Sequence, residues 1–298
     1  MAWGEFRGIA NYLQEKSGIV ARLKKWRAFA ALTGFDVNKL EPFVSSLRVS
    51  DGPHIRTLSN PKLPIDLATL SGARLIGYYG DSNNRNGAFT NKDYTLHMDF
   101  RDVVKEVLGD ITITETVSAR GGFGEGKYIR TNVGYLVPSA LSAAGFDNTR
   151  DQKLANNPFP SWLFDCPPQI RSECLSALWD AEGCVRSQDV KVSQTVPVTL
   201  YPEEYIPEWP DNKPFKHLGL DNQSLVLANP PLLLVSAAVM LCSFGIVSRL
   251  SPQKAYVCDG ISTAYWWLRV QRVQSIRAFH SSIVLRSPRK QAKLNSLV

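Results

Sequence analysis

The stretch Leu175-Ser176-Ala177-Leu178-Trp179-Asp180-Ala181-Glu182-Gly183 constrains the fold more than any other part of the chain. It ends an amphipathic segment with an acid and a glycine, and two small residues, Ala177 and Ala181, lie one helical turn apart. Positions four apart share one face of a helix, so this nearly bare face lets a second helix approach closely. The carboxylate of Glu182 then lies at the helix end. We therefore expect a second helix of the same kind elsewhere in the chain.

A second small-residue segment that ends in an acid lies earlier, from Ser71 to Ser82. After each segment the chain continues with an apolar helical stretch, a β-rich stretch and a closing helix. The apolar stretches run from Tyr94 to Leu108 and from Leu227 to Phe244, and the closing helices from Val133 to Ala144 and from Ser275 to Leu285. Within the β-rich stretches, Lys127-Tyr128-Ile129-Arg130-Thr131-Asn132 parallels Trp266-Trp267-Leu268-Arg269-Val270-Gln271. Two copies of one element order predict a pseudo-twofold molecule.

These residues resemble the LAGLIDADG homing endonuclease family in its single-chain form with two fused half-domains. Leu175 to Gly183 matches the family motif at most positions, whereas Gly77-Tyr78-Tyr79-Gly80-Asp81 is one residue shorter than the usual pattern and is followed by Ser82 instead of Gly. The resemblance covers roughly residues 60 to 298. It implies an α+β fold of two pseudo-twofold-related αββαββα half-domains that form a β-saddle. The implied divisions are an N-terminal extension (1–60), a first half-domain (61–150), a linker (151–170) and a second half-domain (171–298) with an insertion near 196–216.

The resemblance also implies a function, that of a site-specific double-strand DNA endonuclease. In this family the acids corresponding to Asp81 and Glu182 bind divalent metal ions, and each half cleaves one strand. Mg²⁺ suits such a site because it is held by one or two carboxylates together with phosphate oxygens and water; Mn²⁺ is an alternative, and Ca²⁺ is expected to support binding without cleavage. The alternative interpretation for each acid is a solvated side chain at a helix end without a role in catalysis. Asp180 cannot share a face with Glu182, and we expect it to be structural or a helix-surface acid.

Basic and polar residues on the strands complete the predicted site. Arg130, Arg269 and Gln271 fall where strands lead into the last helix of each half, and we expect them to polarise the attacking water or the scissile phosphate. They are equally compatible with contacts to backbone phosphates or with a solvated face. One face of an antiparallel sheet packs on helices, so the other can read base edges or remain solvated. The candidate DNA-contacting residues are Arg85, Thr90, Lys92, Arg120, Lys127, Arg186, Lys191 and Ser193.

Charge and cysteine usage agree with a nucleic-acid partner inside a cell. Lys and Arg outnumber Asp and Glu by 34 to 27, and a net charge of +7 favours polyanions because neutralised phosphates release counterions. Five cysteines without a CxxC pair argue against a disulfide framework or a zinc finger, and they indicate a reducing setting such as the cytoplasm, the nucleoid or an organelle. We expect a monomer bound to double-stranded DNA with a long target site, with intron RNA as the other partner considered. A non-cleaving regulator or an intron maturase on the same scaffold is the alternative function.

The remaining segments carry weaker signals. Apolar residues at helical spacing predict two short helices, Trp3 to Leu13 and Ile19 to Phe29, which form either a helix-turn-helix variant or a small helical buttress. Glycine and proline mark Arg48 to Leu63 as a linker and Gly121 to Lys127 as a hairpin tip. The apolar run from Leu232 to Val247 is shorter than the ~20 residues that span a bilayer, so it predicts a core helix and no membrane association.

Overall fold

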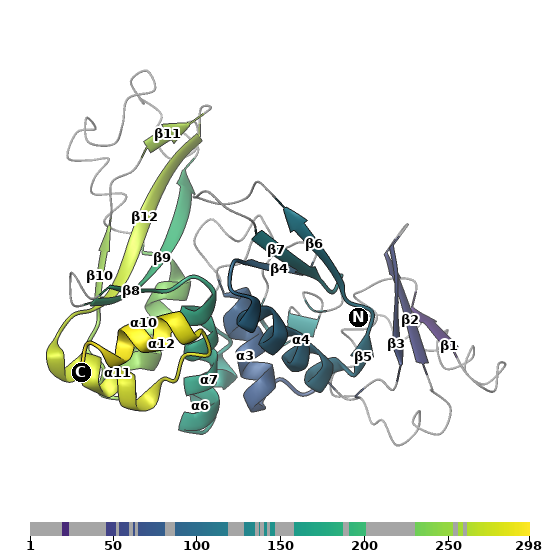
Figure 1. Ribbon diagram of the computed structural model, residues 1–298, viewed down its shortest axis with the longest axis horizontal. Helices are drawn as coiled ribbons and strands as arrows, with labels where there is room; N and C mark the ends of the chain where they lie inside the picture. Colours follow the sequence, from purple (N-terminus) through teal and green to yellow (C-terminus); the bar gives the residue numbers. More distant parts are fainter. Residues whose placement is uncertain are drawn as a thin grey trace. The chain divides into compact units, whose positions relative to one another are not determined.

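The computed structural model describes residues 20–23, 46–51, 54–59, 62, 65–80, 87–118, 128–134, 137, 140–141, 144–146, 158–186, 191–200, 230–252, 256–258 and 261–298. The chain divides into two compact units, residues 1–148 and 149–298 (Figure 1). Both units mix helices with small sheets that are mostly antiparallel, which confirms the predicted α+β class.

Helices α3 (Leu70–Tyr79) and α4 (Tyr94–Leu108) of the first unit begin and end at local sequence signals. The hydroxyl of Thr69 accepts a hydrogen bond from the Gly72 N–H at 3.0 Å, and the carboxylate of Asp93 accepts one from the Thr95 N–H at 3.1 Å. Such side-chain oxygens satisfy donors that have no partner within the first helical turn. Gly109, with φ of 92°, ends α4 in a conformation that suits glycine. Helix α4 therefore has the bounds predicted for this segment.

A three-stranded sheet, in the order β4-β7-β6, covers these helices with one of its faces. Its strands are β4 (Ala88–Asn91), β6 (Thr114–Ser118) and β7 (Tyr128–Asn132), all antiparallel. Phe89 stacks on Phe100 of α4 with ring centroids 5.0 Å apart, and the Tyr78 ring of α3 meets Phe89 edge-on at 4.9 Å. Because β6 pairs directly with β7, the segment predicted as a hairpin tip, whose residues lie outside the described ranges, joins two paired strands.

The N-terminal part corrects two predictions. Its described residues form strands β1 (Val20–Leu23), β2 (Ser46–Asp51) and β3 (His54–Ser59), which continue to β5 (Asp110–Ile111) in the order β1-β2-β3-β5. Val20–Leu23 lies inside the segment predicted as a second helix, so that helix and the helix-turn-helix variant built on it are not what the structure has there. The predicted linker contains an antiparallel hairpin, because Asp51 pairs with His54. The segment from Trp3 to Leu13 lies outside the described residues.

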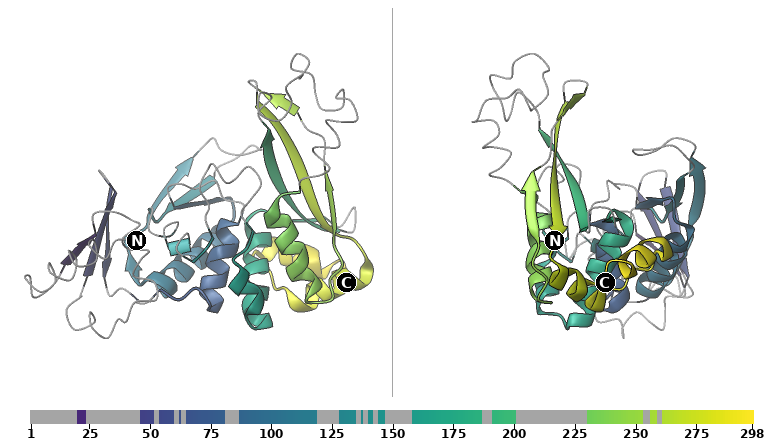
Figure 2. Two further views of the ribbon diagram at one scale, coloured as in Figure 1. Left: turned by 180° about the vertical axis from the view of Figure 1, so that it is seen from behind. Right: turned by 60° about the vertical axis from the view of Figure 1, so that its left-hand side comes forward.

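The second unit contains the predicted order helix–strand–strand–helix–strand–strand–helix, with one additional helix at each end and one additional short strand, β11. Its elements are α6 (Ser161–Asp165), α7 (Pro168–Ala181), β8 (Cys184–Arg186), β9 (Lys191–Leu200), α10 (Leu232–Cys242), β10 (Arg249–Pro252), β11 (Tyr256–Cys258), β12 (Ile261–Val270), α11 (Val273–Ser282) and α12 (Pro288–Asn295). The antiparallel sheet runs β10-β12-β9-β8, with β11 paired to β12. Figure 2 shows the long strands β9 and β12 extending beyond the helices at one end of the sheet.

Strand order repeats between the two units. In each unit, the last strand of the repeat lies between two other strands. One of these strands comes before the middle helix in the sequence, and the other comes after it. This gives β4-β7-β6 in the first unit and β9-β12-β10 in the second. Residues 81–86, where the counterpart of β8 is expected, lie outside the described ranges. The repeat read from the sequence is thus present in the described topology of both units.

Two predicted boundaries shift. Part of the expected linker is helical, because α6 starts at Ser161 and α7 at Pro168, and the Phe159 N–H donates a hydrogen bond to the Ser236 hydroxyl at 3.1 Å. The first residues of the expected insertion, 196–200, belong to β9 and pair with residues 262–266 of β12. Strand pairing over a long sequence distance decided the second boundary, and turn-forming composition did not reveal it.

The core of the second unit joins α7, α11 and the helix-facing side of β12. Trp179 and Phe279 are fully buried and meet edge-on with ring centroids 5.3 Å apart. Leu268 and Val270 are buried at alternate positions of β12, as expected for a strand with one covered face. The apolar run that begins at Leu232 forms α10, a core helix as predicted. In the described part of the chain, no helix is long and apolar enough to cross a membrane.

Candidate functional site

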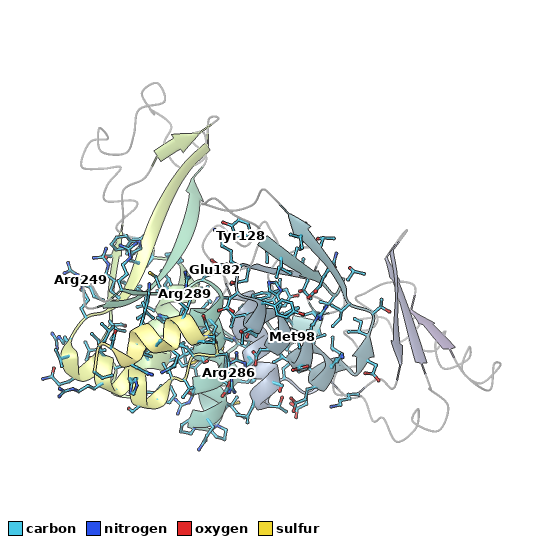
Figure 3. The ribbon with its side chains drawn as sticks, viewed as in Figure 1. Met98, Tyr128, Glu182, Arg249, Arg286 and Arg289 are labelled. Atoms are coloured by element: carbon cyan, nitrogen blue, oxygen red, sulfur yellow. The ribbon has the colours of Figure 1, made fainter. Side chains whose placement is uncertain are left out.

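Helix α7 ends at Glu182, which caps it and precedes β8 directly. The backbone N–H of Glu182 donates to the Leu178 carbonyl at 3.2 Å, and that of Gly183 to the Trp179 carbonyl at 3.0 Å. The Glu182 side chain is exposed although its two neighbours are buried (Figure 3). A Cβ on Gly183 would lie 2.5 Å from Cδ1 of Trp179, so only glycine lets the chain pass this close to the indole. The acid–glycine pair therefore presents a carboxylate at the point where a buried helix turns into the sheet.

Asp180, two residues earlier, has a different role. Its side chain is completely buried, and its carboxylate accepts hydrogen bonds from the backbone N–H groups of Arg286 at 2.9 Å and Ser287 at 3.0 Å. These N–H groups belong to the N-cap residue of α12, Ser287, and to the residue before it, where the backbone donors have no partners within the helix. Asp180 is thus structural, one of the two roles predicted for it.

Lys290 is a neighbour of Glu182 that sequence reasoning missed. Its ammonium donates hydrogen bonds to the backbone carbonyls of Trp179 at 2.8 Å and Asp180 at 2.6 Å, which lie in the last turn of α7. Burial lowers the pKa of Lys290 below its ordinary value, while the nearby acids Asp180 and Glu182 act in the opposite direction. The contact joins residues 110 positions apart, and the sequence carried only a basic cluster near the C-terminus as a signal.

Four predicted site residues of the second unit occupy adjacent register positions in one sheet. Arg186 is opposite Lys191, and Ser193 is opposite both Cys184 and Arg269. Directly opposite residues share a face of an antiparallel pair. The structure adds Arg249, which sequence reasoning did not single out and which lies opposite Arg269 on the other side of β12 (Figure 3).

Arg269 belongs to the face of this sheet that the helices do not cover. It alternates along β12 with Leu268 and Val270, which are buried. Its guanidinium carbon lies 3.4 Å from the ring centroid of Trp267, also on this face. A guanidinium stacked on an aromatic ring presents both charge and a flat apolar surface, and nucleic acids offer a partner for each.

The sheet of the first unit has a comparable open face. Arg130 of β7 is opposite Thr90 and Thr116, both exposed. The ammonium of Lys92 lies 4.6 Å from the ring centroid of Tyr128, two residues before Arg130 (Figure 3). The structure therefore places Thr90 opposite Arg130, and Lys92 against Tyr128 on the same strand as Arg130.

The helix-facing side of the same sheet holds a buried histidine. His97 of α4 is fully buried, and its Nδ1 lies 2.7 Å from the Thr131 hydroxyl oxygen while its Nε2 lies 3.1 Å from the Asn91 carbonyl oxygen. Burial is the largest influence on His97 and lowers its pKa below 6.5. Its polar contacts tie α4 to β4 and β7, so this histidine serves the packing of the sheet.

The remaining predicted site residues are Gln271 and four residues outside the described ranges. Gln271 is exposed immediately after β12. Asp81, Arg85, Arg120 and Lys127 lie outside the described residues. Asp81 comes directly after Gly80 in the sequence. Gly80 is the C-cap of α3, the position that Glu182 occupies in α7.

The described residues offer Glu182 as a single exposed carboxylate and not as part of a preformed metal cage. Among them, no group of three or more His, Cys, Asp or Glu side chains is placed to hold a metal ion. A hard divalent cation such as Mg²⁺ does not need such a cage, because one or two carboxylates, phosphate oxygens and water complete its shell. The donor set at the end of α7 fits such an ion only when a substrate supplies further oxygens.

Comparison with known proteins yields likeness in structure only. No protein-family model matches the sequence, and no curated protein matches it. Mesophilic variants of the homing endonuclease I-DmoI align over 77% of this chain and 98% of theirs, with 14% identity and a TM-score of 0.39. The crystal structure of I-DmoI in complex with DNA and Mn aligns over 73% of this chain and 98% of that one, with 12% identity and a TM-score of 0.32.

Proposed function

We propose that this protein is a site-specific, divalent-metal-dependent endonuclease that cleaves both strands of DNA. The observation that carries the proposal is the exposed carboxylate of Glu182 at the end of the buried helix α7, directly before a sheet whose open face holds Arg269. A nuclease needs an acid beside a surface that binds phosphate, and in this unit an exposed acid precedes a sheet that carries arginine side chains. The repeated topology supports a matching role for Asp81 in the first unit.

Each chemical role falls to a residue type suited to it. Asp81 and Glu182 would hold Mg²⁺, or Mn²⁺ in its place, which activates water and stabilises charge on the phosphate. Arg130 and Arg269 would orient the scissile phosphates by charge-assisted hydrogen bonds. Gln271 would hold the attacking water. The open face of each sheet would contact the duplex, and each acid would serve one strand.

Recognition of a long target is proposed for the open faces of the two sheets. Thr90, Lys92 and Arg186 are exposed, and hydroxyl and cationic groups can contact base edges or phosphates. Arg85, Arg120, Lys127, Lys191 and Ser193 would extend the surface. The protein would act as a monomer with two catalytic acids, inside the compartment that holds its target.

The test starts by selecting bound duplexes from a genomic fragment library in Ca²⁺, followed by a change to Mg²⁺. We expect the selected fragments to be cut at one position by the wild-type protein. Glu182→Gln should bind them with unchanged affinity and should lose cleavage of at least one strand. Asp165→Asn is the matched control, because Asp165 is also an exposed acid at a helix end, that of α6.

Three outcomes would contradict the proposal. Cleavage by the Glu182→Gln variant at the wild-type rate would show that Glu182 does not take part in catalysis. Tight, salt-sensitive binding without cleavage in any divalent ion would make the protein a DNA-binding regulator, a role that the shortened first motif favours. Selection of intron RNA instead of DNA would indicate a maturase.

A further inference from the structure

We propose that Lys290 is a positioning residue for Glu182, and that helix α12 sets the geometry of the proposed site by holding the last turn of α7. The inference rests on the proposed function for its catalytic consequence. Its structural part rests on the contacts of the Lys290 ammonium with the Trp179 and Asp180 carbonyls. These are the second and third residues before Glu182 along the chain.

The last carbonyls of a helix have no partners within it, and the aligned peptide dipoles make this end negative. A buried ammonium that bonds two of these carbonyls satisfies them and compensates the dipole. Without it, the Trp179 carbonyl would keep the Gly183 N–H as a donor but lose the ammonium, and the Asp180 carbonyl would lose its hydrogen bond to that ammonium. The turn would then fray, and Glu182 would lose its fixed direction.

The hydrogen bonds between α7 and α12 run in both directions. Lys290 of α12 satisfies the carbonyl end of α7, and Asp180 of α7 satisfies the amide end of α12 through the Arg286 and Ser287 N–H groups. Upstream, the hydroxyl of Ser176 donates to the Val284 carbonyl, so the chain that leads into α12 is also held along α7. Each helix thus fixes the end of the other.

Charge supports the same assignment. The ionisable groups that act on Lys290 are Asp180, Glu182, Cys184 and Arg289. Asp180 accepts hydrogen bonds at the amide end of α12, whereas the Glu182 side chain is the exposed acid of this group. A displacement of about 1 Å at a reacting centre can lower a rate about 100-fold, so the hold on this turn matters for catalysis.

The experiment compares Lys290→Met and Lys290→Arg with Lys293→Met, which removes an exposed lysine of the same helix. Amide hydrogen exchange is measured in the metal-free protein, and nicking of a target plasmid is resolved by strand. We expect Lys290→Met to speed exchange at the Glu182 and Gly183 amides about tenfold or more, because each depends on the last turn of α7. Cleavage of the strand served by Glu182 should fall about 100-fold, with the other strand little affected.

Lys290→Arg keeps two donors and should restore much of both signals, and Lys293→Met should behave as wild type. Unchanged exchange at the two amides in Lys290→Met would overturn the proposal. An equal loss of both strand cleavages with faster exchange throughout the unit would mean general destabilisation and would also overturn it. If Lys290→Met does not fold, Lys290→Arg provides the test. If Lys290→Arg folds and its Glu182 and Gly183 amides exchange at the wild-type rate, but it cuts neither strand, the result would count against a positioning role for Lys290. A wild-type protein that never cuts would refute the proposed function alone, because the exchange result decides the hold on α7 by itself.

Discussion

Replacing Asp180 by Asn should destabilise the second unit strongly, although the change removes no heavy atom. The buried carboxylate accepts two backbone hydrogen bonds, from Arg286 at 2.9 Å and Ser287 at 3.0 Å. An amide keeps one acceptor oxygen, and its NH₂ group must face the other N–H donor. One charge-assisted hydrogen bond is lost and one buried donor is left without a partner, for which we expect a total of about 3 kcal/mol.

Thermal and urea unfolding, monitored by circular dichroism, measure this effect. For a unit that spans residues 149–298, a loss of about 3 kcal/mol corresponds to a fall in Tm of about 6–12 °C. Glu182→Gln is the matched control, because it makes the same chemical change two residues away on an exposed side chain. We expect it to shift Tm by no more than about 2 °C. Equal effects of the two substitutions, or a loss below about 1 kcal/mol for Asp180→Asn, would refute the reasoning.

Three further changes follow from single contacts. Gly183→Ala places a Cβ 2.5 Å from Trp179 Cδ1 and 2.6 Å from its carbonyl oxygen, so we expect a loss of about 1–3 kcal/mol in urea unfolding. Because burial lowers the pKa of His97 below 6.5, the unfolded chain binds a proton in the window just below 6.5 that the folded chain does not. Stability should therefore fall as pH falls through that window, and His97→Gln should flatten the profile of Tm between pH 5 and 8. Asp99→Ala leaves the guanidinium of Arg74, whose side chain is 4% exposed, without its carboxylate at 2.6 Å. It should cost about 3 kcal/mol, and the double variant with Arg74→Leu should be more stable than Asp99→Ala alone.

Local signals explain the predictions that the structure confirms. Asp93 and Gly109 lie within a few residues of the ends of α4, and each acts through its own backbone or through the adjacent turn. The same holds for the acid and glycine that end α7, so the placement of Glu182 at a helix end could be predicted. The repeat could be predicted because two copies of one pattern confirm each other along the chain. Asp81 remains a prediction.

Strand pairing explains the predictions that were wrong. Helical spacing in Ile19–Phe29 and turn residues in Arg48–Leu63 are real patterns, yet strands occupy Val20–Leu23 and much of the second segment. A short strand gains most of its stability from a partner that may lie far away in sequence, as β3 does with β5. A window of a few residues does not contain that partner.

The sequence by itself determined the order of elements within the repeat, the α+β class and the acid that ends α7, because these depend on interactions within a turn or on repetition. Only the tertiary structure decided how the end of α7 is held. The Lys290 ammonium and the carbonyls it binds are 110 and 111 residues apart, and Asp180 and Glu182 differ in role although both are acids of one motif. Burial and the partners brought by α12 separate them, because the buried Asp180 carboxylate accepts two backbone hydrogen bonds that stabilise the fold, whereas the Glu182 side chain is exposed.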